Sequence, residues 1–167
     1  MYQTTVNTNV FNGRLLDRWV VCVPTNGVVK VNGCAVMGRG FARSASEGTI
    51  QDVAGRLGKL LQEKGNHVHD LGDYTNEDGA KFRLVSFPTK EHWKDDSSLG
   101  LIERSAKELS SLIRRRRWKR VYLPAPGCGN GHLSWNHVKP RLEKHLPKNV
   151  TILSFKSIDY SKVRGKE

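Results

Sequence analysis

Apolar residues in this chain form short continuous runs that alternate with segments of helical periodicity. The run WVVCVPT, 19–25, is apolar almost throughout and ends at Asn26-Gly27. This pattern predicts a strand that is buried on both faces of a sheet. Four further segments predict strands by the same reasoning: HVHDL (67–71), FRLVSFP (82–88), RVYLP (120–124) and VTILSF (150–155).

Two helices are predicted in the first half of the chain. Thr49 stands three residues before Asp52, as in a capping box, and apolar residues then recur at helical spacing up to Lys64-Gly65. A shorter helix is predicted to open near Phe41. Its free N–H groups favour a bound anion.

Two more helices are predicted in the second half. Ser97 or Ser98 is expected to cap a helix whose apolar positions fall three and four residues apart. The other helix follows the segment 125–135. Because proline is tolerated in a helix only near the first turn, Pro140 predicts a start at about Asn136.

Strands that alternate with helices along the whole chain predict one three-layer α/β domain, residues 1–167. There is no internal repeat and no composition shift that marks a domain boundary. Only the ends, before about Thr5 and after about Tyr160, are expected to be loosely held.

Composition narrows the class of protein. The 167 residues contain no apolar stretch long enough to span a membrane, and the first ten residues are polar, so we expect a cytoplasmic protein without a membrane partner. The three cysteines are far apart. They favour neither a disulfide framework nor a paired metal site.

The chain is strongly basic, with 28 Lys and Arg against 16 Asp and Glu and a formal net charge of +12. Such a charge attracts polyanions, so nucleic acid is a candidate partner through a basic surface. The densest run is RRRRWKR, 114–120. Closure of a helix, where cations complement the dipole, is favoured over nucleic-acid contact for this run.

Two glycine-rich loops follow predicted strands, at 26–40 and 125–131. Ligands bind at the carboxyl ends of strands in such sheets, and glycine lets a ligand approach the backbone closely. Either loop alone is as well explained by simple chain turning. Together they are suited to hold a diphosphate between them.

Three segments carry a family resemblance: VMGRGFA (36–42), FPTKEHW (87–93) and LPAPGCGNGHLSW (123–135). They resemble the macrodomain family, and within it the branch of DNA-ADP-ribosyl glycohydrolase antitoxins and terminal ADP-ribose glycohydrolases. Small basic macrodomains encoded by phages are also similar. The resemblance implies a three-layer α/β/α fold with a mixed, mostly parallel central sheet, and a cleft for ADP-ribose at its carboxyl edge.

The resemblance also assigns binding residues. Asn26 would orient the distal ribose and serve catalysis, with Asn32 as a competitor, and Phe155 would stack on adenine. The remaining residues expected to contact the ligand lie in the two loops: Val36, Met37, Gly38, Arg39 and Gly40 in the first, and Gly127, Cys128, Gly129, Asn130, Gly131 and His132 in the second.

Lys90 is the main catalytic candidate, since the resemblance places a lysine of this segment beside the anomeric carbon of the distal ribose. Its amine would either attack that carbon or assist departure of the linked group. His132 has the titration range for proton transfer, although a solvated histidine is the simpler interpretation. Cys128 has no evident basic partner, which favours packing over nucleophilic work.

The chain departs from the family at Asn130-Gly131, where the protein-directed glycohydrolases carry an aspartate. We therefore expect an ADP-ribose-binding hydrolase that acts on an ADP-ribosylated nucleic acid or protein, as a monomer, without metal or cofactor. Alternatives are a non-catalytic module that binds ADP-ribose or a related nucleotide signal, an ADP-ribose 1″-phosphate phosphatase, and a basic nucleic-acid-binding protein with a vestigial cleft.

Overall fold

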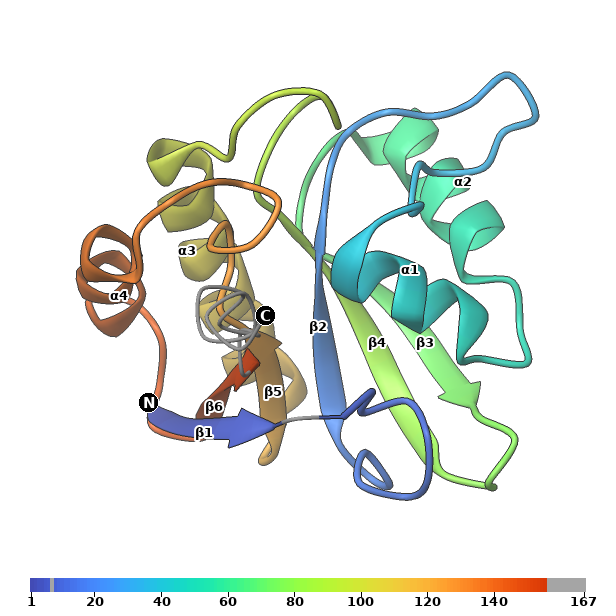
Figure 1. Cartoon of the computed structure of the whole chain (residues 1–167), viewed down its shortest axis with the longest axis horizontal. Helices are drawn as coiled ribbons and strands as arrows, with labels where there is room; N and C mark the ends of the chain where they lie inside the picture. Colours follow the sequence, from blue (N-terminus) through green and yellow to red (C-terminus); the bar gives the residue numbers. More distant parts are fainter. Residues whose placement is uncertain (7, 156–167) are drawn as a thin grey trace, which may run out of the picture.

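The computed structural model describes residues 1–6 and 8–155, except the side chain of Phe155. Its centre is a six-stranded sheet in the order β1-β6-β5-β2-β4-β3 (Figure 1). The strands are β1 Tyr2–Val6, β2 Val20–Thr25, β3 His69–Thr75, β4 Lys81–Pro88, β5 Val121–Pro124 and β6 Val150–Phe155. Neighbouring strands are parallel except β3 and β4, so the predicted mixed, mostly parallel sheet is confirmed.

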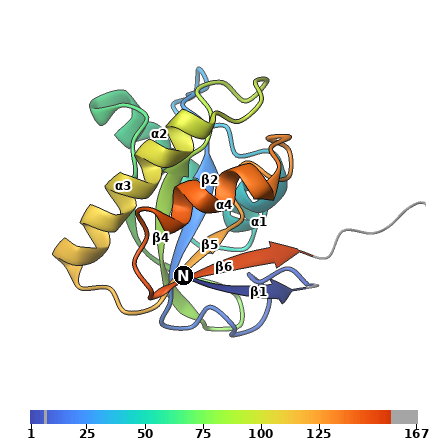
Figure 2. The ribbon, with the colours of Figure 1, turned by 90° about the vertical axis from the view of Figure 1, so that its left-hand side faces the viewer.

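Helices cover both faces of the sheet, as predicted. The helices are α1 Gly40–Glu47, α2 Val53–Lys64, α3 Leu99–Arg116 and α4 Trp135–Glu143. Helices α1 and α2 share one core cluster with Val21 and Val23 of β2, whereas α3 and α4 share the other with Val20 and Cys22. Figure 2 shows α3 and α4 together on one side. The continuous apolar run of β2 therefore fills two cores at once.

Helix caps agree with the sequence at one helix and correct it at another. Ser98 caps α3, and its hydroxyl accepts a hydrogen bond from Leu101 N. The cap of α2 is Asp52, whose carboxylate accepts from Gly55 N, so the predicted capping box at Thr49 is wrong. The Thr49 hydroxyl instead donates to Ala45 O, because α1 ends directly before it.

One helix start agrees with the prediction, whereas one strand extends beyond it. Helix α4 begins at Trp135, next to the predicted start at about Asn136, and Pro140 is its sixth residue. Strand β3 begins at His69 and continues to Thr75, beyond the predicted end at Leu71. Its buried positions, His69, Leu71 and Tyr74, are separated by polar residues and a glycine, so no apolar run marks where it ends.

The first strand was not predicted at all. Residues Tyr2–Val6 form the edge strand β1, parallel to β6, where a loosely held end was expected. Four of its five residues are exposed, so the segment carries no hydrophobic pattern. In the part of the chain that the structure describes, no helix has the length and apolar character needed to cross a membrane.

Candidate functional site

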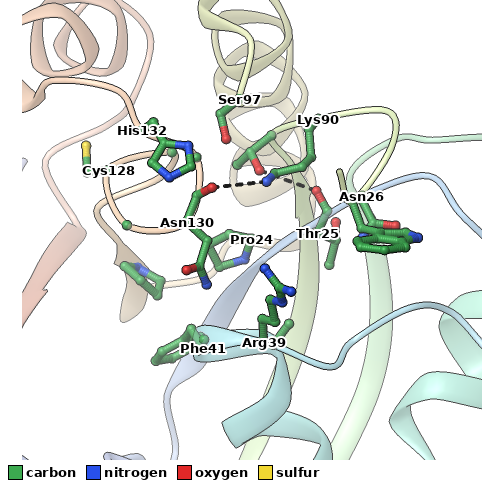
Figure 3. A pocket seen from close by; sticks show the side chains of 18 of the residues that line it. Pro24, Thr25, Asn26, Arg39, Phe41, Lys90, Ser97, Cys128, Asn130 and His132 are labelled. Carbon is green, nitrogen blue, oxygen red and sulfur yellow. Dashed lines mark hydrogen bonds between the residues drawn. The ribbon is translucent and has the colours of Figure 1, made fainter. Parts of the chain in front are cut away.

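A cavity of about 1070 Å³ opens at the carboxyl edge of the parallel strands. Its walls come from the segments that follow β2, β4 and β5, together with the start of α1 and Ser154 of β6. Parallel strands end at one edge of a sheet, which brings these segments together although they are far apart in the sequence. Figure 3 shows side chains from all three segments directed toward a common space.

The glycine-containing part of the first loop, residues 36–40, is held by Asn26, which directly follows β2. We call residues 36–40 the first glycine loop. The Asn26 amide donates to Val36 O (3.1 Å), and its carbonyl accepts from Val28 N (2.9 Å). Arg39 precedes α1, and no side chain caps this helix. The N-terminus of α1, the positive end of the helix dipole, therefore lies at the cavity wall without a side-chain cap, an arrangement that attracts an anion.

The second glycine loop, 127–131, packs so closely that side chains do not fit at its ends. A Cβ on Gly131 would lie 2.1 Å from Ser97 Oγ, and Gly127 has a φ of +75°. The loop approaches the first one at Gly40, where a Cβ would lie 3.1 Å from Asn130 Nδ2. The two loops thus form opposite walls of a narrow part of the cavity.

Lys90 lies at the cavity directly after β4. Its Nζ donates to the carbonyl oxygen of Asn130 at 3.4 Å, a contact drawn in Figure 3. Its own carbonyl accepts from Asn66 Nδ2 (3.2 Å), which fixes the backbone from the side of α2. The half-buried lysine side chain is therefore directed at the second loop instead of extending into solvent.

The electrostatics of the lining favour an anionic ligand. The lining contains three cationic side chains, those of Arg39, Lys90 and Lys94, and one carboxylate, that of Asp95. The Arg39 side chain extends toward the cavity from the first loop (Figure 3). With a helix N-terminus on one wall and three cations in the lining, the cavity has the chemistry of a phosphate site.

His132 follows the second loop and lines the cavity. Its Nδ1 lies 2.7 Å from a carboxylate oxygen of Asp96, and both side chains are exposed. Its φ is +61°, which is uncommon outside glycine. A histidine oriented by a carboxylate is equipped for proton transfer, and its place beside the second loop keeps this role open.

Cys128 is also in the lining but is not equipped as a nucleophile. Burial raises the pKa of its thiol, and the thiol donates to Pro126 O at 3.5 Å. The protonated thiol is the unreactive form. This agrees with the interpretation that Cys128 packs within the loop.

Two lining residues that sequence reasoning missed carry buried hydroxyls. The side-chain oxygens of Thr25 and Ser97 are buried and have no hydrogen-bond partner among the described residues. A buried hydroxyl usually has a partner, so these two are suited to receive one from a ligand. Ser97 had been considered only as a helix cap. Trp93 is another missed residue, 39% exposed at the rim.

The structure gathers nearly all predicted site residues around this one cavity. The cavity-lining residues among them are Asn26, Val36, Met37, Gly38, Arg39, Gly40, Lys90, Gly127, Cys128, Gly129, Asn130, Gly131 and His132. Asn32 does not line it, and its side chain caps a turn at Cys34 N instead. The side chain of Phe155 lies outside the described residues. No group of three potential metal ligands occurs in the ranges that the structure describes.

Comparison with known proteins agrees with this architecture. A DNA ADP-ribosyl glycohydrolase of Thermus aquaticus is 38% identical over 136 residues, which span 80% of this chain and 36% of that protein. A DNA ADP-ribosyl glycohydrolase of Mycobacterium tuberculosis is 35% identical over 117 residues, 67% of this chain and 32% of that protein. The chain thus spans about a third of the length of these curated relatives. No family model matches the sequence.

Solved structures show the same fold. The macrodomain of Mycobacterium tuberculosis DarG has a TM-score of 0.68 at 25% identity and covers 93% of this chain and 99% of that one. Thermosipho africanus DarTG in complex with ADP-ribose has a TM-score of 0.73 at 22% identity, covering 98% of this chain and 44% of that one. The sheet, the two helical layers and the cleft therefore define a macrodomain. More narrowly, this chain is a macrodomain that resembles those of DarG, the DNA ADP-ribosyl glycohydrolases.

Proposed function

We propose that this macrodomain binds ADP-ribose in the cavity and hydrolyses the glycosidic bond that links ADP-ribose to a macromolecule, with DNA as the favoured carrier. The observation that supports this most is the meeting of Lys90 with both glycine loops at one cavity, where Lys90 Nζ lies 3.4 Å from Asn130 O. The curated relatives are named for the same reaction on DNA.

The diphosphate belongs between the two loops in this proposal. The uncapped N-terminus of α1 directs the positive end of its dipole from one side, and the second loop lies opposite, close to Gly40. The Arg39 guanidinium adds a charge-assisted donor from the first loop. The distal ribose then lies toward Lys90 and Asn26, which line the same cavity.

The proposed reaction is attack of water on the anomeric carbon. The bond between this carbon and the carrier breaks, water supplies the new hydroxyl group, and its remaining proton goes to the departing group. An amine attacks as a nucleophile only after a base has taken its proton, and the group that Lys90 Nζ contacts is a backbone carbonyl, not a base. We therefore assign Lys90 the role of a cation that stabilises the charge developing on the departing group.

Release of ADP-ribose from an ADP-ribosylated DNA oligonucleotide tests this assignment. We expect Lys90→Ala to lower the rate by about 10²-fold or more, the range lost when a positioned proton donor or charge stabiliser is removed. Lys107→Ala is the control, because it removes an exposed lysine of α3 that is not among the residues lining the cavity. It should retain most of the activity, and calorimetry should show that both variants still bind ADP-ribose.

A non-catalytic binding module is the second candidate, and Asn130 is the observation that favours it. An amide stands there instead of the aspartate of the protein-directed glycohydrolases, so no carboxylate faces Lys90 from the second loop. Tight binding of ADP-ribose without release by the wild-type chain would support the module. Equal release by wild type and Lys90→Ala would refute the assigned role of Lys90 while leaving binding intact.

A further inference from the structure

The arginine-rich run 114–120, which begins in the last turn of α3, belongs to a second charged surface, distinct from the cavity. We define the basic edge as six exposed residues at the end of the molecule where the parallel strands begin: Arg114, Arg115, Arg117, Lys119, Arg120 and Lys148. The cavity lies at the opposite end, where these strands finish. In Figure 1 the turn that joins α3 to β5 lies in the lower part of the view.

Hydrogen bonds join the two segments that supply these cations, residues 114–120 and the loop before β6. Asn149 Nδ2 donates to Trp118 O, and Val121 N donates to Asn149 O (3.3 Å), so the turn at 117–120 is tied to the loop that contains Lys148. Trp118 is partly buried against the core of α3 and α4 and anchors this turn. The cations therefore project from fixed backbone.

Arg120 is held further by an aromatic stack. Its guanidinium lies 4.5 Å from the ring centroid of Trp19, which in turn stacks on Tyr122 at 3.6 Å. Such cation–π contact restricts the side chain without neutralising it. Less conformational entropy is lost when a partner binds a cation that is already positioned.

Carboxylates do not neutralise the basic edge. None of its six residues has an ion pair among the residues the structure describes, whereas neighbouring Arg116 pairs with Asp70 at 3.0 Å. Asp17 and Asp73 are also paired with other cations, Asp17 with Arg14 and Asp73 with Arg83. The helix dipole accounts for cations in the last turn of α3 but not for those that precede β5 and β6.

We propose that the basic edge binds the phosphate backbone of duplex DNA, independently of the cavity and of the reaction proposed for it. Unpaired, fixed cations release counterions when they contact phosphates, which is the main source of non-specific affinity for DNA. An anionic membrane fits less well as the partner. Membrane-surface binding usually combines cations with exposed apolar side chains, and the segments that supply the basic edge contain no exposed large hydrophobic residue. Contact at this edge would tether the macrodomain to DNA while the cavity stays open.

Fluorescence anisotropy with an unmodified 20-base-pair duplex, measured between about 50 and 300 mM salt, tests the proposal. The test variant carries R114Q, R115Q, K119Q and K148Q. The control carries K30Q, K59Q, K64Q and K107Q, which removes the same charge from exposed lysines elsewhere. We expect the test variant to bind the duplex about tenfold or more weakly than wild type. The slope of log affinity against log salt should become shallower by about two to four, because fewer phosphates are contacted.

Three results would overturn the proposal: no binding of the duplex by the wild-type chain, equal losses in the two variants, or displacement of the duplex by saturating ADP-ribose. Binding of the wild-type chain to phosphatidylserine vesicles, without binding to the duplex, would assign the surface to a membrane instead. Circular dichroism and melting curves of both variants should match wild type, because every substituted residue is exposed. Binding of unmodified DNA does not require catalysis. A failure of this proposal can therefore be distinguished from a failure of the reaction assigned to Lys90.

Discussion

At the residue scale, the site depends on a few side chains whose hydrogen bonds the fold dictates. The motif segments around Lys90 and the two loops were predictable, because they carry the family resemblance in the sequence itself. The choice between Asn26 and Asn32 was not, since both follow the same apolar run. Only the folded chain shows that Asn26 lines the cavity and braces Val36, whereas Asn32 faces solvent.

This difference gives a prediction with a matched control. Asn26→Ala removes the hydrogen bonds to Val36 O and Val28 N, so the first loop loses its tie to β2. We expect ADP-ribose affinity to fall about tenfold, or about 1.4 kcal/mol. Asn32→Ala removes a comparable turn-capping bond to Cys34 N away from the cavity and should leave affinity unchanged in the same calorimetric titration.

Thr25 and Ser97 show where residue-level prediction stops. Both are small polar residues beside structural landmarks, the end of β2 and the start of α3, and nothing in their sequence context marks them as site residues. Their buried, unpartnered hydroxyls become visible only when the walls of the cavity are assembled.

At the element scale, hydrophobic patterning predicted the elements that are buried and failed for those that are not. Strands β2, β4, β5 and β6 carry apolar runs because helices cover both faces of the sheet there. The exposed edge strand β1 has no such run, so pairing with β6 alone defines it. The cap of α2 was misplaced because Thr49 and Asp52 are both good cap residues.

The docking of α4 onto α3 gives a prediction at this scale. Glu103 of α3 accepts hydrogen bonds from His145 and Arg141 and lies 3.6 Å from Lys144. The hydrogen bond from His145, followed by the charges of Lys144 and Arg141, lowers the pKa of Glu103 to about 2. A lowered pKa in the folded state means that this stabilisation is complete above the ordinary value of 4.5 and is lost as pH falls toward 2.

Glu103→Gln should therefore lower the free energy of unfolding at pH 7, and the gap to wild type should narrow as pH falls below about 4.5. Urea unfolding at a series of pH values measures this gap. Glu143→Gln is the control, because the one ion pair of this exposed α4 residue within the described part of the chain is with Lys139 at 3.7 Å. A gap that is constant with pH would contradict the assigned role of the Glu103 carboxylate.

At the scale of the whole molecule, function is divided between the two ends of one sheet. The cavity with the two glycine loops lies where the parallel strands end, and the basic edge lies where they begin. The net charge of +12 was evident from composition, but its distribution was not, because the contributing segments meet only through the parallel strand pairing. Each end is therefore open to separate testing.

Thermal unfolding gives a prediction for the molecule as a whole. A ligand that binds only the folded state at 100 times its Kd adds about 2.7 kcal/mol of stability. For a chain of this size we expect ADP-ribose to raise Tm by roughly 5–10 °C under that condition. Ribose alone should not, because it lacks the diphosphate that the loops are proposed to hold. Equal shifts with both compounds would argue against a diphosphate site.

The most direct test of the central claim is an experimental structure of this chain with ADP-ribose bound. We expect the diphosphate between loops 36–40 and 127–131, and Lys90 Nζ within about 4 Å of the distal ribose or of its anomeric oxygen, the separation that productive contact requires. ADP-ribose bound elsewhere, or a distal ribose turned away from Lys90, would contradict the claim.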